Sequence, residues 1–166
     1  MIIDHDPERF RPVVRLDHPA GIVEVAGTGL PLVRIVRSPG TEAHPHIPVG
    51  ARDRALLTLT VDGAPARIVP GRGRLLRSSY RVDAFTGDTR YRLVPCSLDS
   101  SRFLRDGAPL GTFTSEGDGH VRSEGFADAG AQPRDIAVGT ALAAAFGTGG
   151  QPWWATALDM AGELTP

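Results

Sequence analysis

The sequence contains no lysine and no asparagine, so all 18 basic residues among its 166 residues are arginines. We take this bias as mutational pressure from a G+C-rich, bacterial genome. Without lysine the chain has no Schiff-base nucleophile and no phosphate-binding lysine of a P-loop, and without asparagine it has no N-glycosylation site. These classes of chemistry are therefore excluded by composition alone.

Cysteine is almost absent as well, since Cys96 is the only one in the chain. A single cysteine excludes an internal disulfide and a cysteine-rich metal site within one chain, and a reducing cytoplasm suits it. Strong net charge is also lacking: the formal value is -1 and the sequence pI is about 6.5. We therefore do not expect nucleic acid as a partner, although a local basic patch could still exist.

Long apolar runs are missing too. The longest one, residues 141–146, is far shorter than the ~20 residues that span a membrane. Asp4, Asp6 and Glu8 stand where a signal peptide would be basic and then apolar. We expect no transmembrane segment, a cytoplasmic location, and one domain over residues 1–166, because 41% hydrophobic and 22% charged residues are ordinary for a globular chain.

What the sequence does have is turn residues, with 20 glycines and 14 prolines that separate short apolar or alternating runs. Such runs are typical of strands. We predict ten of them between residues 13 and 126, at 13–16, 22–26, 32–37, 55–61, 66–69, 75–85, 89–94, 101–105, 109–114 and 120–124. Asp-Gly and Gly-rich turns at residues 62–63, 86–88, 106–107 and 117–119 predict hairpins and hence an antiparallel meander, while residues 37–52 predict a long loop.

The character of the chain changes after Gln132. Pro133 suits the first position of a helix, Asp135 its first turn and Gly147 its C-terminal cap, so we predict a helix over residues 133–146. From residue 136 onward only Gly139 and Thr140 are not apolar, and a helix without a polar face is expected to be buried on all sides.

Burial of this helix decides the fold class. In a chain of strands, the helix must lie inside a barrel or between a sheet and a second layer. We predict a mainly β (α+β) fold, a closed or nearly closed antiparallel β-barrel around the buried apolar C-terminal helix. A second, short terminal helix is predicted over residues 152–161.

Residues 80–87 (YRVDAFTG), residues 103–111 (FLRDGAPLG) and the helix start at residues 135–138 resemble the tubby C-terminal-like proteins, which include LURP-one-related proteins and phospholipid scramblases. The resemblance covers roughly residues 75–146. It implies a closed antiparallel barrel of about twelve strands around a hydrophobic C-terminal helix. The acidic calcium segment and palmitoylated cysteine cluster of scramblases have no counterpart here, so the resemblance implies the fold and not the scramblase activity.

Glu42, His44 and His46 alternate along the predicted loop. In an extended segment the three side chains would face one way and could bind a metal ion. His-x-His also opens the cupin metal motif, but Pro48, Val49, Gly50 and Ala51 occupy the positions where a glutamate would follow. An ordinary surface loop is the simpler interpretation, and we predict no resident metal or cofactor.

Arginines are concentrated between residues 67 and 81, namely Arg67, Arg72, Arg74, Arg77 and Arg81. Guanidinium groups bind phosphate and carboxylate in a bidentate manner, so this stretch could hold an anionic small molecule or a lipid headgroup. Charges at strand edges also protect against aggregation, which is the alternative explanation. From this stretch we single out Arg72, Arg74, Arg77 and Arg81 as ligand-binding candidates.

Trp153 and Trp154 form the other conspicuous pair. They would either plug one end of the core or serve as an interface, with a homodimer ahead of a membrane contact. For catalysis, the chain has no Gly-x-Ser-x-Gly elbow, and Asp118, His120 and Ser123 form too ordinary a cluster to assign as a triad. We name no catalytic residue.

The sequence therefore points to no reaction that can be named. The leading hypothesis is a non-catalytic binding or scaffolding barrel, with an anionic small molecule or lipid headgroup as ligand. One alternative is a small enzyme with its site at the barrel mouth, using His44 and His46 or Asp83. Another is a structural protein that forms oligomers through Trp153 and Trp154.

Overall fold

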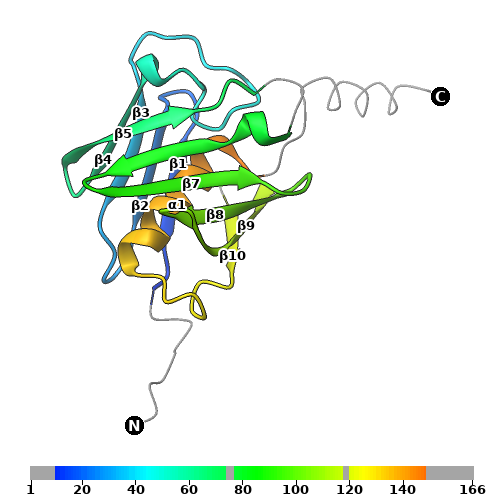
Figure 1. Ribbon diagram of the computed structural model, residues 1–166. Helices are drawn as coiled ribbons and strands as arrows, with labels where there is room; N and C mark the ends of the chain where they lie inside the picture. Colours follow the sequence, from blue (N-terminus) through cyan, green and yellow to red (C-terminus); the bar gives the residue numbers. More distant parts are fainter. Residues whose placement is uncertain (1–9, 74–76, 118–119, 149–166) are drawn as a thin grey trace.

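The computed structural model describes residues 10–73, 77–117 and 120–148 (Figure 1). These residues form ten strands, two short 3-10 helices and one α-helix. Their bounds are β1 (Val13–Asp17), β2 (Ile22–Ala26), β3 (Val33–Arg37), η1 (Arg54–Leu56), β4 (Leu57–Val61), β5 (Ala64–Pro70), η2 (Arg77–Tyr80), β6 (Val82–Thr86), β7 (Thr89–Pro95), β8 (Ser100–Arg105), β9 (Ala108–Gly117), β10 (His120–Glu124) and α1 (Pro133–Phe146).

The ten strands form one antiparallel sheet in which each strand pairs with the next along the chain, from β1 to β10. The sheet curls until it is nearly closed into a barrel, and Figure 1 shows α1 packed against its concave side. The predicted meander and the predicted fold class are both confirmed. In the described ranges no helix is long and apolar enough to cross a membrane.

One predicted strand is wrong in its first half. Residues 75–85 do not form a continuous strand, because Arg77–Tyr80 is the 3-10 helix η2 and β6 begins only at Val82. The Arg81 N–H donates to the carbonyl of Ser78 at 3.2 Å, which closes a turn just before β6. Serine side chains compete for local backbone groups, so Ser78 and Ser79 favour such a turn over a strand.

The hairpin turns predicted at residues 62–63, 86–88 and 106–107 are where the sequence places them, whereas most of the turn predicted at residues 117–119 lies outside the described residues. Asp62 and Asp106 are the described non-glycine residues with positive φ, at 48° and 50°. Each carboxylate also accepts a hydrogen bond from a neighbouring part of the barrel, Asp62 from the Leu32 N–H at 2.8 Å and Asp106 from the Arg90 N–H at 2.9 Å. An aspartate in this conformation therefore both makes the turn and attaches it to the next segment.

Helix α1 has the predicted bounds, and ten of its 14 residues are buried. It contacts β1, β2, β3, β7, β8, β9 and β10, so apolar contacts surround it as expected for a helix without a polar face. The approach is close at Gly139, where a Cβ would lie 2.6 Å from the ring of Phe113 and 2.9 Å from that of Phe103. Small residues on α1 thus let the barrel close around it.

The start of α1 carries a buried ionic cluster. The carboxylate of Asp135, a residue only 2% exposed, accepts hydrogen bonds from Tyr91 Oη at 2.7 Å, Arg105 Nη1 at 2.5 Å and the Gln132 N–H at 2.8 Å. Burial, followed by the bond to Asp135, raises the pKa of Tyr91 well above its usual value. At this end of the barrel the buried carboxylate of Asp135 therefore has a cationic partner, Arg105, and two further hydrogen-bond donors.

Candidate functional site

The opposite end of the barrel, where α1 ends, is shaped by the long loop between β3 and η1. The guanidinium of Arg37 holds this loop by donating to the carbonyls of Val49 at 2.9 Å and Pro19 at 2.8 Å. The Val49 N–H in turn donates to the carbonyl of Ala145 at 2.9 Å. The last turn of a helix has carbonyls without helical partners, so this bond attaches the loop directly to the end of α1.

Gly50 is required for this arrangement. Its φ is +90°, a conformation that residues with a side chain rarely adopt, and a Cβ there would collide with the guanidinium of Arg37. The loop thus passes so close to a buried arginine that only glycine fits. The loop is therefore a structured part of this end of the barrel. The predicted loop over residues 37–52 is confirmed.

A cavity of about 1100 Å³ opens at this end, which we call the mouth cavity. Its walls come from the loop, η1, the end of β5, Tyr80, the turn between β7 and β8, and the end of α1. The lining residues are Glu42, His44, His46, Ile47, Pro48, Gly50, Ala51, Arg52, Asp53, Arg54, Leu56, Val69, Pro70, Arg72, Gly73, Tyr80, Leu98, Phe146, Gly147 and Thr148.

Positive charge exceeds negative charge in this lining, because it contains three arginines (Arg52, Arg54 and Arg72) and two carboxylates (Glu42 and Asp53). Asp53 is already engaged, because its carboxylate accepts a hydrogen bond from the Ala55 N–H at 2.9 Å and caps η1. In the described ranges neither Arg54 nor Arg72 has a carboxylate within ion-pair distance. The cavity wall therefore carries one arginine more than it has carboxylates, and Arg54 and Arg72 form no ion pair with the described residues.

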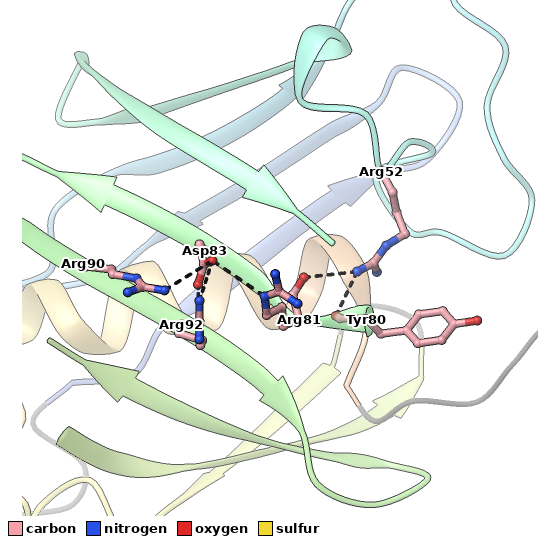
Figure 2. Close-up of polar contacts among 6 residues, drawn as sticks. All are labelled: Arg52, Tyr80, Arg81, Asp83, Arg90 and Arg92. Atoms are coloured by element: carbon pink, nitrogen blue, oxygen red, sulfur yellow. Dashed lines mark hydrogen bonds and ion pairs between the residues drawn. The ribbon is translucent and has the colours of Figure 1, made fainter. Parts of the chain in front are cut away.

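Arg52 is the most constrained of these cations. Its Nε donates to the carbonyl of Gly71 at 3.0 Å. Its Nη2 donates to the carbonyl of Tyr80 at 2.8 Å, as Figure 2 shows. Its guanidinium carbon lies 5.3 Å from the ring centre of Tyr80 and 5.5 Å from that of Phe146. Burial lowers the pKa of Arg52 to about 10, which leaves the group charged at neutral pH.

No described carboxylate forms an ion pair with Arg52, and among the described residues its Nη1 makes no hydrogen bond. Carbonyl oxygens satisfy two of its nitrogens, but they do not neutralise its charge. A partly desolvated cation of this kind, in a cavity wall, is a candidate for binding an anion.

Glu42, His44 and His46, singled out in the sequence, all line the mouth cavity. Glu42 and His44 lie in an irregular part of the loop and His46 lies in a turn; His44 Nδ1 accepts a hydrogen bond from the His46 N–H at 3.2 Å. The two imidazole rings are edge to face, with centres 5.9 Å apart. In the part of the chain that the structure describes, no three His, Cys, Asp or Glu side chains are placed to hold a metal ion.

The four candidate arginines do not share one environment. Arg72 lines the mouth cavity, whereas Arg81 lies on the outside of the sheet with its Nε 4.0 Å from Asp83. Arg74 lies outside the described residues; Arg77 belongs to η2, but its side chain lies outside the described part of the structure. Trp153, Trp154 and the short helix predicted over residues 152–161 also lie outside the described residues.

Arg52, Arg54 and the aromatic pair of Tyr80 and Phe146 were not singled out in the sequence. The only local signal is the Arg52-Asp53-Arg54 triplet at the end of a loop, which is common on protein surfaces. Comparison of the chain with protein-family models, curated proteins and solved structures finds no match. The function is therefore inferred from the chemistry of the cavity itself.

Proposed function

We propose that this protein is a non-catalytic binding module whose mouth cavity takes an anionic ligand, either a small molecule with a phosphate or carboxylate group or the headgroup of a lipid. The observation that carries the proposal is Arg52, a partly desolvated guanidinium in the cavity wall without a carboxylate partner in the described structure. A bound anion would supply the missing charge, and Arg54 and Arg72 line the same space.

Cavity size favours a ligand larger than a single phosphate ion. A volume of about 1100 Å³ lies just above the range of about 300–1,000 Å³ found for sites of drug-sized molecules. Apolar side chains share the lining with the arginines, namely Ile47, Leu56, Val69, Leu98 and Phe146. We therefore infer an amphipathic ligand, with its anionic group near the arginines and its apolar part against these side chains.

Two binding experiments test the proposal and separate the two sources of the anion. Inorganic pyrophosphate is titrated by calorimetry, and vesicles of phosphatidylcholine with or without a fifth of phosphatidic acid are used for co-sedimentation. The test variant is Arg54→Glu with Arg72→Glu, and the control is Arg15→Glu with Arg122→Glu, which makes the same charge change on the outer surface. Far-UV circular dichroism confirms that both variants fold.

We expect the wild type and the control to bind, and the test variant to bind at least tenfold more weakly. Binding of pyrophosphate indicates a small anion, whereas binding of the acidic vesicles alone indicates a lipid headgroup. If neither probe binds the wild type, or if test and control variants lose binding equally, the mouth cavity is not an anion site.

A small enzyme at the barrel mouth is the second candidate function, favoured by His44 and His46 in the cavity lining. This candidate requires a stoichiometric metal ion in the purified protein that is lost when His44→Ala and His46→Ala are combined. A homodimer through Trp153 and Trp154 is a separate proposal. A sedimentation coefficient that falls to the monomer value in Trp153→Ala would support it.

Kinship with the tubby C-terminal-like proteins also remains a proposal, supported by the antiparallel barrel around an apolar helix. The described residues form ten strands, compared with about twelve in that group. The lone Cys96, which is exposed, suits a reducing compartment such as the cytoplasm. Fractionation of the cells that produce the protein would test this location.

A further inference from the structure

The outer surface of β5 to β8 is rich in arginine. Inward positions on these strands hold core residues such as Ile68, Ala84 and Leu93, and the alternate positions point outward. The outward positions, with the residue directly before β6, include five arginines: Arg67, Arg81, Arg90, Arg92 and Arg102. We call these five residues the basic face.

Asp83 is the one acidic residue at the outward positions of β5 to β8. Arg92 binds it in a bidentate manner, with Nε at 2.7 Å from one carboxylate oxygen and Nη2 at 3.0 Å from the other. Arg90 and Arg81 lie farther away, at 3.7 Å and 4.0 Å (Figure 2). The Asp83–Arg92 pair is therefore matched, while Arg81 and Arg90 share a carboxylate that is already engaged.

Arg67 and Arg102 have no carboxylate partner in the described structure. Arg67 is stacked over the ring of Phe85, 4.2 Å from its centre, and Arg102 is exposed. Other acidic residues nearby, Asp88 and Asp106, lie in the turns at one end of the strands. The face as a whole thus carries four arginines in excess of its one matched pair.

The opposite side of the barrel is balanced, and this contrast makes the excess specific. On the outer positions of β1 to β3, the two arginines Arg15 and Arg34 are matched in number by Asp17 and Glu24; Arg15 lies opposite Glu24 in the strand register, and Glu24 forms an ion pair with Arg34 at 3.1 Å. A general shortage of acidic residues therefore does not explain the basic face, since the whole chain has 19 acidic and 18 basic residues.

Apolar side chains alternate with the arginines on this face. In the strand register Phe85 lies between Arg67 and Arg90, Asp83 and Arg92 lie between Val69 and Leu104, and Val94 is paired with Arg102. These four apolar residues are neither fully buried nor fully exposed. A phosphate backbone would use only the charges, whereas a polypeptide with carboxylates and apolar side chains would use both.

We propose that the basic face docks an acidic segment of another protein in which carboxylates alternate with apolar side chains. The carboxylates pair with Arg67, Arg81, Arg90 and Arg102. The apolar side chains cover the exposed parts of Phe85, Val94 and Leu104. None of the four arginines that would pair with these carboxylates lines the mouth cavity, although Val69 borders both surfaces, so variants of those arginines test this proposal separately.

Fluorescence anisotropy tests the proposal with a labelled twelve-residue peptide of alternating glutamate and valine. Its lysine-valine counterpart and a single-stranded RNA of the same length are measured beside it. The test variant is Arg67→Glu with Arg102→Glu, because neither residue has a carboxylate partner to lose. The variant Arg15→Glu with Arg122→Glu is again the control for the charge change. Because Arg122 loses ion pairs with Glu116 and Glu124 in this variant, circular dichroism is used to confirm that both variants fold.

We expect the acidic peptide to bind the wild type and the control alike, and the test variant at least tenfold more weakly. Binding should also weaken when the salt concentration is raised from 50 to 300 mM, since the pairs are exposed. No binding of the acidic peptide, tighter binding of the RNA, or an equal loss in the control variant would each overturn the proposal. Arg54→Glu with Arg72→Glu should leave peptide binding unchanged.

Discussion

The two ends of α1 place charge in opposite ways. At its start, the buried carboxylate of Asp135 has a guanidinium, a phenol and a backbone N–H as donors. At its end, the guanidinium of Arg52 has carbonyls and aromatic rings around it, and no carboxylate in the described structure. A buried charge with a complete set of partners holds a fold together, whereas one without a counter-charge can accept it from a ligand.

The largest effect is expected when a cation is placed on α1 at a position without the carbonyl groups and aromatic rings that surround Arg52. Ala144 is 2% exposed in the last turns of the helix, and Ala144→Arg would force an unpaired guanidinium into the apolar core. We expect the domain not to fold, as measured by loss of near-UV circular dichroism and of a cooperative urea transition. Ala127→Arg, at an exposed position before the helix, is the control and should fold normally.

A folded Ala144→Arg variant with a transition close to that of the wild type would show that α1 is not enclosed. In that case the helix would have a face open to solvent, and the comparison between its two ends would lose its basis. A folded Ala127→Arg control shows that an added arginine does not by itself prevent folding, so a loss of the fold in Ala144→Arg can be attributed to burial.

Asp135→Asn is expected to have the next largest effect. The substitution removes the charge that Arg105 and Tyr91 share, and breaking such a buried pair costs about 3 kcal/mol in the free energy of unfolding. Urea denaturation measures the loss, with Asp88→Asn in an exposed turn as the control. A cost below about 1 kcal/mol for Asp135→Asn, the size expected for an exposed ion pair, would mean that the cluster is not the structural anchor described here.

At the same end of α1, Tyr91 is expected to have a smaller, pH-dependent effect on the free energy of unfolding. Its pKa is raised in the folded state, first by burial and then by its bond to Asp135, so folding favours the protonated phenol. The stability it contributes is fully present below pH 10, the usual pKa of tyrosine, and is lost as the pH rises above that value. We expect the urea midpoint of the wild type to fall between pH 8 and pH 11 more steeply than that of Tyr91→Phe.

Comparison with Tyr91→Phe isolates this effect: the chain has no lysine, and Arg52, whose pKa is about 10, is the same in both proteins. Parallel curves for the wild type and Tyr91→Phe would contradict the prediction. At pH 8 the variant itself should be about 1 kcal/mol less stable, the net value of one buried hydrogen bond.

Most of the fold could be predicted from the sequence, because its signals are local. The Asp-Gly turns, the alternating runs and the two capped ends of α1 each specify their own element within a few residues. The error in residues 75–85 arose where Ser78 and Ser79 formed a turn inside an otherwise strand-like run. That turn is also why Arg72 and Arg81, close in sequence, lie in different environments.

The candidate site could be predicted only in part. His44, His46 and Arg72 were singled out as two unrelated groups, and the fold brings both into one cavity. Arg52 was missed because its importance comes from Tyr80 and Phe146, which are 28 and 94 residues away in sequence and contact it only in the folded protein. No local pattern marks an arginine that will lack a counter-charge.

The most direct test of the difference between the two ends of α1 is an NMR titration of the arginine side-chain N–H groups with inorganic pyrophosphate. We predict saturable shifts of the signals of Arg52, Arg54 and Arg72, and no shift of Arg105, whose charge Asp135 already matches. If pyrophosphate causes no shift, the same titration with a soluble short-chain phosphatidic acid should shift those three signals. Saturable shifts confined to arginines outside the mouth cavity, equal shifts at Arg52 and Arg105, or no saturable shift with either titrant would contradict this account.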